Sequence, residues 1–318
     1  MPAEREILVA SPRGFCAGVS YAIDIVDLVL ERHGPPVYVR HEIVHNRHVV
    51  DKLRAQGAVF VDELAAVPAG SLVIFSAHGV APSVREEATQ RGLRIIDATC
   101  PLVTKVHLEA LRYARDGYEI LVIGHRGHVE VVGTLGHAPD LMQLIETVED
   151  VARMQVRDPE RVAVVTQTTL SVDDTRDIIE AIRQRLPHVR LPAKDDICYA
   201  TQNRQVAVKE LARQSELVLV IGSPNSSNAN RLVEVANNAG GKGRLIEHAS
   251  DVDPSWLDGV RTVGLTAGAS TPESLVQDTI AHLRRQGFDR VRDLTTVEEH
   301  VTFPLPRELR EPVGARPA

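Results

Sequence analysis

Short runs with apolar side chains on both faces alternate with helix-length stretches along this chain of 318 residues. Runs such as LVIF, ILVI, VAVV and LVLV are typical of strands buried between the two helical layers of a parallel sheet. The pattern predicts strands at residues 6–10, 37–40, 72–76, 93–96, 119–123, 161–166, 217–221 and 261–265, and helices at 20–31, 103–115, 175–185 and 205–212. This alternation indicates a doubly wound α/β fold.

One motif occurs three times in the chain. Each copy begins with a cysteine at a predicted strand-to-helix transition, and these cysteines are Cys16, Cys100 and Cys198. A polar turn follows each cysteine after 28 or 29 residues, at His45, His128 and Ser226. A second polar turn lies 62 to 72 residues after the cysteine, at His78, Thr168 and Ser270. Such self-similarity predicts three structural units of one plan.

The expected organisation is three similar α/β domains with mostly parallel sheets, arranged pseudo-threefold around a common centre. We place them at residues 17–99, at 100–196, and at 1–16 together with 197–285, followed by a C-terminal tail, 286–318, with residues 310–318 disordered. Ligands of open α/β sheets bind outside the carboxyl ends of the strands. Because the polar turns follow strands, the three cysteines and six turns should converge on one cavity.

Composition narrows the classes of protein. The net charge of −7 argues against a general nucleic-acid binder. The sequence has no apolar run long enough for a transmembrane helix, and its start lacks the pattern of a signal peptide. We therefore expect a cytoplasmic protein with neither a membrane nor a nucleic acid as partner. An odd count of three cysteines in a reducing compartment fits free or metal-bound thiols better than disulfides.

The cysteines favour one iron–sulphur cluster. A helix N-terminus lowers the pKa of a thiol, so we expect all three to ionise readily. Structural zinc usually takes four ligands, often with a close CxxC pair, and this chain has no such pair. A four-iron cluster usually takes four cysteines, so three would leave one iron open to substrate. Three unrelated buried thiols are the alternative.

The polar turns favour an anion. Imidazole, hydroxyl and amide donors beside helix N-termini suit a diphosphate, and the candidates are His45, His78, His128, Ser226, Ser227, Asn228 and Ser270. Neither a Walker A sequence nor a GxGxxG fingerprint is present, which argues against a nucleotide. Glu130 among these donors is a candidate proton source, and the hydroxyl of Thr168 could orient a substrate alcohol. A single histidine of this kind would otherwise be a capping or surface residue, and Glu130 a helix-start glutamate.

These motifs together resemble the 4-hydroxy-3-methylbut-2-enyl diphosphate reductase family, which catalyses the last step of the non-mevalonate isoprenoid pathway. The resemblance covers about residues 6–285 and a tail segment, through PRGFCAGV (12–19), VRHEIVHN (39–46), FSAHGV (75–80), DATCPLVTKVH (97–107), TQTTLSVDDT (166–175), DDICYATQNRQ (195–205), GSPNSSNANRL (222–232), TAGAS (266–270) and FPLPREL (303–309). It implies reductive removal of the allylic hydroxyl by two electrons and two protons, giving isopentenyl and dimethylallyl diphosphates. Ferredoxin or flavodoxin is the implied electron donor.

The resemblance also implies roles for individual residues. Cys16, Cys100 and Cys198 would ligate three irons of a [4Fe-4S] cluster. Glu130 would deliver protons, with Thr168 as a relay or orienting hydroxyl, and the remaining histidine, serine and asparagine candidates would bind the substrate, mainly its diphosphate. One departure is visible: the family commonly has His-Pro-Glu where this chain has His128-Val129-Glu130. Valine removes the fixed φ of proline, which puts the rigidity of this turn in doubt.

Three other functions stay open at this level. A hydro-lyase would use an open iron without redox change and would need no reductant. A non-catalytic iron–sulphur sensor or scaffold would need no anion pocket beside its cluster. A diphosphate-binding α/β protein with incidental cysteines would purify without iron or labile sulphide under anaerobic conditions.

Overall fold

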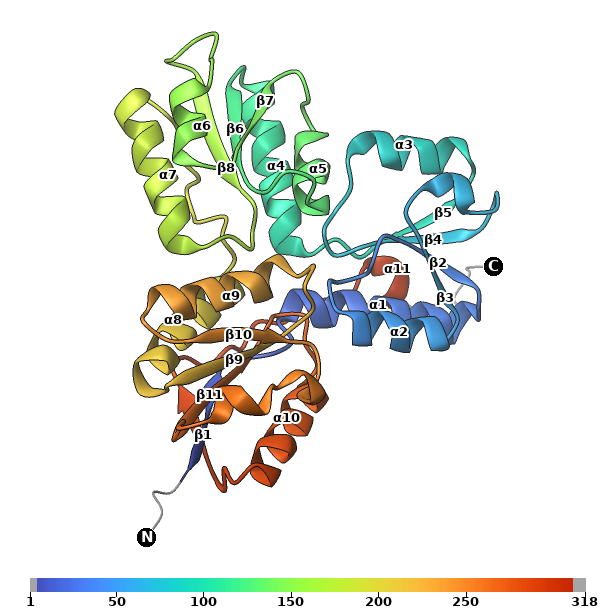
Figure 1. The fold of residues 1–318 in the computed structure, drawn as a ribbon. Coiled ribbons are helices and arrows are strands. Elements are labelled where there is room, and N and C mark those ends of the chain that lie inside the picture. The colour runs from blue at the N-terminus through green and yellow to red at the C-terminus, as the bar shows by residue number, and fades with distance from the viewer. Residues whose placement is uncertain (1–4, 311–318) are drawn as a thin grey trace.

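The computed structural model describes residues 5–310 and shows three α/β lobes that meet at a common centre (Figure 1). Each lobe is built on one parallel sheet, with strand orders β3-β2-β4-β5, β7-β6-β8 and β10-β9-β11-β1-β12. The predicted fold class, three α/β units with parallel sheets, is therefore confirmed. The domain boundaries stay a prediction, although each sheet draws its strands from one of the three predicted units and, in one case, from the C-terminal segment as well.

The first two lobes follow each other along the chain. The first contains α1 (Ala17–His33), β2 (Val37–Arg40), α2 (Arg47–Ala55), β3 (Ala58–Val61), the 3-10 helix η1 (Leu64–Ala66), β4 (Leu72–Phe75), α3 (Pro82–Gln90) and β5 (Arg94–Asp97). The second contains α4 (Pro101–Arg115), β6 (Glu119–Ile123), α5 (Val129–Leu135), β7 (Met142–Ile145), α6 (Val148–Arg153), β8 (Val162–Thr166) and α7 (Val172–Arg185).

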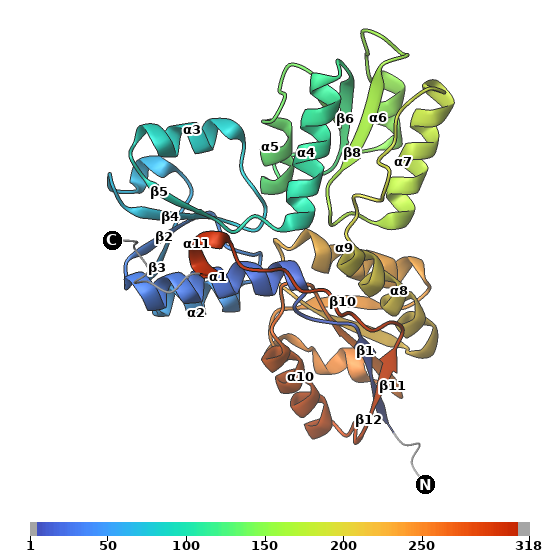
Figure 2. The same ribbon diagram turned by 180° about the vertical axis from the view of Figure 1, so that it is seen from behind.

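The third lobe combines both ends of the chain. It contains β1 (Glu6–Ser11), α8 (Tyr199–Gln214), β9 (Leu217–Ile221), α9 (Ser227–Asn238), β10 (Gly243–Ile246), the 3-10 helices η2 (Ala249–Asp251) and η3 (Pro254–Leu257), β11 (Thr262–Ala267), α10 (Glu273–Arg285) and β12 (Arg290–Thr295). The short helix α11 (Arg307–Arg310) instead lies beside α1 of the first lobe, as seen from behind in Figure 2.

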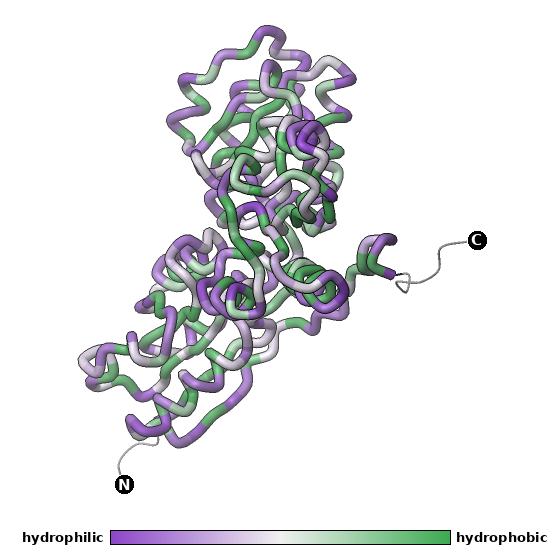
Figure 3. Tube along the Cα trace, turned by 90° about the vertical axis from the view of Figure 1, so that its right-hand side faces the viewer, coloured by the Kyte–Doolittle hydropathy of each residue, from purple (hydrophilic) through white to green (hydrophobic). Residues whose placement is uncertain are grey.

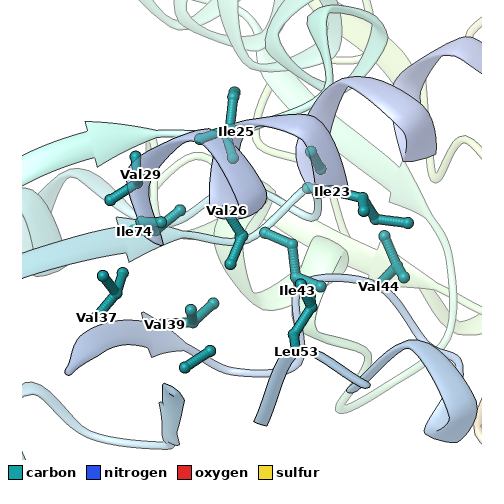
Figure 4. Packing of buried hydrophobic residues seen from close by; sticks show 14 of the residues in the cluster. Ile23, Ile25, Val26, Val29, Val37, Val39, Ile43, Val44, Leu53 and Ile74 are labelled. Atoms are coloured by element: carbon teal, nitrogen blue, oxygen red, sulfur yellow. The ribbon is translucent and has the colours of Figure 1, made fainter. Parts of the chain in front are cut away.

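The strands are buried on both faces, as the apolar runs predict. Every residue of β4, β8 and β9 is buried. In the first lobe, Val26 and Val29 of α1 pack with Val39 of β2 and Ile74 of β4 (Figure 4). Hydropathy follows the same plan in Figure 3, where green apolar segments concentrate inside the lobes and purple polar segments lie mainly outside. Burial of apolar side chains on both sheet faces thus stabilises each lobe separately.

All eight predicted strands form within two residues of the expected bounds, but β3, β7, β10 and β12 are not among them. All four are edge strands of their sheets. Edge strands are often short and polar, and the sequences AVFV, MQLI and GRLI of the first three accordingly include exposed and partly buried side chains beside buried ones. The missing strand occupies the same place in each unit, after the first polar turn.

Two expectations need correction. The segment 286–318 is not simply a tail, because β12 pairs with β1 over Glu6–Ser11 and extends the third sheet. The segment before Cys198 is not a strand either: it makes a single parallel bridge between Ala163 and Arg190, since the prolines at 187 and 192 interrupt it. The predicted disorder falls mainly on residues 311–318, which lie outside the described residues; Arg310 ends α11.

Within the described part of the chain, residues 5–310, none of the helices combines the length and the apolar character needed to cross a bilayer.

Candidate functional site

One cavity lies where the three lobes meet, and all the site residues predicted from the sequence line it. They are Cys16, Cys100, Cys198, His45, His78, His128, Glu130, Thr168, Ser226, Ser227, Asn228 and Ser270. Their catalytic and binding roles stay predictions, but their proximity is a fact of the fold. None of the described residues that line this cavity is lysine or arginine.

Strand order explains why the polar turns meet there. In the first lobe the chain passes from β2 to the edge strand β3 on one side, and then crosses back to β4 on the other side of β2. The second and third lobes follow the same path, from β6 through β7 to β8 and from β9 through β10 to β11. The order therefore reverses between β2 and β4, between β6 and β8, and between β9 and β11. Ligand crevices of open α/β sheets form at such switch points. The two polar turns of each unit follow these two flanking strands.

Each cysteine is the N-cap residue of the next helix, as predicted: Cys16 of α1, Cys100 of α4 and Cys198 of α8. All three thiols are free in the structure. The expectation that all of them ionise readily is wrong, because burial raises the pKa of Cys100 to about 12 and that of Cys198 to about 11. Desolvation outweighs the helix N-terminus here. A cationic partner among the three sulphurs would lower these pKa values and favour the thiolate form.

The cysteines fit a group larger than one ion. No three His, Cys, Asp or Glu side chains within residues 5–310 are arranged to hold a single metal ion. Gly18, in the first turn of α1, has no side chain, which lets the sulphur of Cys100 lie close to this helix. A Cβ atom built on Gly18 would lie 2.5 Å from Cys100 Sγ and 3.9 Å from Cys16 Sγ. Three free thiols that line one cavity suit a polynuclear cluster, whose irons are each held by separate thiolates.

Three histidines form a second wall of the cavity. The rings of His45 and His78 stack with centroids 4.1 Å apart, and His128 meets both of them edge-on at 5.3 and 6.0 Å. Each ring is fixed through Nδ1: His45 by the Glu42 carboxylate at 3.2 Å, His78 by the Ser76 hydroxyl at 3.2 Å, and His128 by the Glu130 backbone N–H at 3.2 Å. Nε2 of each ring is thereby left for a ligand.

Two of these imidazoles are held neutral. Burial, reinforced by neighbouring histidines, lowers the pKa of His128 to about 3 and keeps the pKa of His78 well below its ordinary value. Since Nδ1 of His128 accepts a hydrogen bond from Glu130 N–H, the proton of the neutral His128 ring lies on Nε2. His128 therefore presents a donor to the cavity. A bound anion would favour the protonated form of these rings.

The N-terminus of α9 completes the polar wall. Ser226 is its N-cap, with its hydroxyl accepting from Ala229 N–H. Asn228 is 4% exposed, and its Oδ1 accepts from Ala269 N–H at 2.9 Å. Its Nδ2 has no hydrogen-bond partner within the described chain, which leaves a buried amide donor for a ligand to satisfy. Such a donor beside a helix N-terminus fits an anion.

Glu130 faces Thr168 across the second lobe. The carboxylate accepts from Thr168 N–H at 2.6 Å through Oε1 and from the Thr168 hydroxyl at 3.0 Å through Oε2. Burial raises the pKa of Glu130 to about 7, against the two hydrogen bonds from Thr168, which favour the charged form. A buried carboxyl with such a pKa can hold and release a proton at neutral pH.

Sequence reasoning missed the residues that hold these groups in place. Glu42 anchors His45 and also accepts from Asn225 Nδ2 at 2.8 Å, which links the first and third lobes. Thr169 bonds the Ser227 hydroxyl at 3.1 Å, and Gln167 Nε2 donates to both of these residues. Glu42 and Thr169 lie inside the motifs VRHEIVHN and TQTTLS, so the polar residues next to each candidate were the available signal.

Comparisons with known proteins agree with this geometry. Residues 7–284 match the family described as LytB protein. The chain is 58% identical over 312 residues to 4-hydroxy-3-methylbut-2-enyl diphosphate reductase 2 of Mycobacterium tuberculosis, covering 98% of this chain and 93% of that one. It is 56% identical to the like-named reductase of Actinobacillus pleuropneumoniae, covering 96% and 98%.

Solved structures show the same likeness. The E-1-hydroxy-2-methyl-but-2-enyl-4-diphosphate reductase of Plasmodium falciparum superposes with a TM-score of 0.94 at 38% identity, covering 96% of this chain and 97% of that one. A structure titled (E)-4-hydroxy-3-methyl-but-2-enyl diphosphate reductase, the terminal enzyme of the non-mevalonate pathway, has a TM-score of 0.64 at 32% identity and covers 88% and 99%.

The Val129 position makes a stability prediction. Val129 is the first residue of α5, where proline is favoured, and His128 before it has φ −66° and ψ 133°, which a following proline accepts. We expect Val129→Pro to raise the free energy of unfolding by about 0.4–1 kcal/mol through the unfolded state. Urea unfolding of the metal-free chain measures this. Val132→Pro in the same helix is the control and should destabilise, because Val132 N–H donates to His128 O at 2.9 Å.

The neutral imidazoles predict proton-linked anion binding. Inorganic pyrophosphate should raise the pKa of His78, whose Nδ1 faces the Ser76 hydroxyl, a group that can accept from a protonated ring, so the affinity of pyrophosphate should increase as the pH falls and its binding should take up protons. Titration calorimetry in two buffers of different ionisation enthalpy measures the uptake. His78→Asn should take up fewer protons than the parent, which separates protonation of the protein from that of pyrophosphate. Equal uptake by both proteins would contradict the role given to His78.

Proposed function

Because this chain belongs to the LytB protein family, we propose that it is a 4-hydroxy-3-methylbut-2-enyl diphosphate reductase. In this proposal the allylic hydroxyl of the substrate leaves as water with the uptake of two electrons and two protons. The products are isopentenyl and dimethylallyl diphosphates. The observation that carries the proposal is one cavity that joins three free thiols to a buried carboxyl with a pKa of about 7 and to a wall of imidazole, hydroxyl and amide groups.

Cys16, Cys100 and Cys198 would hold a [4Fe-4S] cluster. When bound, it would supply the electrons and the Lewis acidity that removal of a hydroxyl group requires. The substrate fits between the cysteines and the opposite wall. His45, His78, His128 and the α9 residues Ser226, Ser227 and Asn228, with Ser270, would bind the diphosphate through Nε2, hydroxyl and amide groups.

Glu130, together with the Thr168 hydroxyl, delivers protons in this proposal. Protonated Glu130 donates a proton to the leaving hydroxyl, which departs as water, and the second proton taken up forms a C–H bond in the allylic skeleton of the product. The Thr168 hydroxyl, bonded to Glu130 Oε2, orients the proton and the substrate alcohol. The cavity walls are largely apolar around the cysteines, with Val19, Val44, Leu102 and Val103 among the lining residues. Exclusion of water by these side chains strengthens every electrostatic interaction in the site. A low-potential donor such as ferredoxin or flavodoxin, in a reducing cytoplasm, would supply the electrons.

The deciding experiment is anaerobic turnover of 4-hydroxy-3-methylbut-2-enyl diphosphate with a reduced viologen and analysis of the products. We expect both isoprenoid diphosphates, and none without the reductant. Conversion without reductant would instead support a hydro-lyase. A colourless protein free of iron and labile sulphide after anaerobic purification would overturn the cluster assignment.

Replacement of Glu130 tests the proton role. The amide of Glu130→Gln can still accept from Thr168 N–H and donate to the Thr168 hydroxyl, so the site keeps its shape. We expect kcat to fall at least about 100-fold, as for loss of a general acid, with iron content and substrate affinity retained. Glu146→Gln, outside this cavity, is the control. Normal turnover by Glu130→Gln would show that another group delivers the proton.

The pKa of Glu130 also predicts a pH profile. The group is protonated below its pKa of about 7, so kcat of the parent should decline as the pH rises through that value. Steady-state rates from pH 5.5 to 8.5 with saturating reductant measure the decline.

Replacement of Gly18 tests whether the cluster needs the close approach of Cys100 to α1. A methyl group in Gly18→Ala would collide with Cys100 Sγ at 2.5 Å. We expect much less iron and labile sulphide per chain in this variant, while circular dichroism of the metal-free chain stays unchanged. Ser71→Ala, in a surface turn, is the control and should keep the parent's iron content. The neighbouring Gly70 is unsuitable, because its φ of +74° would strain the backbone of an alanine variant. Full cluster content in Gly18→Ala would contradict the placement of the cluster beside α1.

A further inference from the structure

The segment after β12, residues 296–310, runs from the third lobe to the first and is here called the C-terminal strap (Figure 2). Thr296 N–H begins it by donating to Ser11 O at 2.9 Å, just ahead of the loop that carries Cys16. Further along, Phe303 packs edge-on against Tyr21 of α1, with ring centroids 6.3 Å apart. Leu309 is 2% exposed in the core of the first lobe. The strap thus passes close to the Cys16 loop and is anchored on both sides of it.

A buried arginine joins the strap to two cysteine-bearing segments. Arg204 lies in α8, six residues after Cys198, and its side chain is completely buried. Its Nη2 and Nε donate to Gly14 O at 2.8 and 3.3 Å, two residues before Cys16. Its Nη1 donates to Ala200 O at 2.9 Å and to Glu299 Oε1 of the strap at 3.0 Å. Asn203 Nδ2 also donates to Glu299 Oε1 at 3.0 Å.

The ion pair with Glu299 compensates for the burial of the Arg204 charge. A buried guanidinium is costly unless it is paired and hydrogen-bonded, and here Glu299, 15% exposed, supplies the charge. The planar fork reaches acceptors in several directions at once, which a lysine ammonium does less well. If the strap leaves, Arg204 loses its counter-charge, so the Cys16 loop and the strap are held in place together.

We propose that Arg204 and Glu299 act as a latch that positions Cys16 relative to Cys198. They are positioning residues, because they act on the thiols through the Gly14 loop and the first turn of α8. The strap contributes Glu299, the carboxylate that pairs with Arg204. The further statement that the latch retains the cluster rests on the function proposed above.

The latch itself can be tested on the full-length metal-free chain. Alkylation of each cysteine by iodoacetamide, followed by mass spectrometry, compares Cys16 with Cys100 in the same sample. We expect Glu299→Gln to speed the alkylation of Cys16 about tenfold, which corresponds to the loss of one charged hydrogen bond, with Cys100 unchanged. Arg204→Lys should show an intermediate rate, as a partial rescue. Arg204→Met would leave Glu299 without its buried partner and is expected to destabilise the fold, so the near-isosteric change Glu299→Gln is the deciding variant.

Asp173→Asn is the matched control. It removes the partner of Lys209, which lies on the same helix as Arg204 and contacts Asp173 Oδ2 at 2.6 Å, away from the cysteine loops. This variant should leave Cys16 reactivity at the parent level. Parent-like reactivity of Cys16 in Glu299→Gln, or an equal rise in Asp173→Asn, would overturn the latch.

The cluster-loaded protein gives a second readout. After anaerobic reconstitution, loss of the visible absorption to an iron chelator should be several-fold faster in Glu299→Gln than in the parent or Asp173→Asn. If the parent takes up no cluster, the proposed function fails, while the alkylation result still decides the latch. If the parent loads and Glu299→Gln matches it in both measurements, the latch is wrong and the proposed function stands.

Discussion

The structure depends on three crossings of the chain from one lobe to the next, each of which ends at a cysteine that lines the central cavity. β1 of the third sheet leads through Cys16 into α1 of the first lobe, and β5 leads through Cys100 into α4 of the second. Cys198 opens α8 of the third lobe. Each crossing is also a helix N-terminus, and the three N-cap cysteines line one cavity. Burial without a cation leaves Cys100 and Cys198 protonated, so both would need a positively charged partner to become thiolates, as the proposed cluster would provide.

Burial in the cavity also determines the protonation of its carboxyl and imidazole groups. Burial keeps Glu130 protonated up to neutral pH and His78 and His128 neutral, and no lysine or arginine is found among the described lining residues. The cavity therefore carries little charge before a ligand enters. An anionic substrate would bring its own charge to a wall of fixed dipoles, which interact strongly in a medium of low dielectric constant.

Sequence reasoning predicted the buried centre of each sheet and the residues that meet there, but not the periphery that holds them. The fully buried strands β4, β8 and β9 have an unbroken apolar pattern, even though β8 is an edge strand, whereas the edge strands β3, β7 and β10 have a pattern diluted by exposed side chains. Cysteine spacing indicated the convergence. The anchors Glu42, Gln167 and Arg204 were missed because a polar residue has no periodic signal of its own. Thiol ionisation was misjudged because burial depends on all three lobes at once.

The lobes are joined differently from the way each is built. Each of the six apolar clusters among the described residues belongs to essentially one lobe, apart from Cys16 and the strap residues Leu305 and Leu309, which pack on the first. Between lobes the site itself supplies hydrogen bonds, from Asn225 to Glu42 and between Thr169 and Ser227. A single hydrogen bond of this kind contributes only about 0.5–1.5 kcal/mol to stability. Any ligand that bridges the three walls must then also strengthen the association of the lobes, so ligand binding and the relative positions of the lobes are thermodynamically linked.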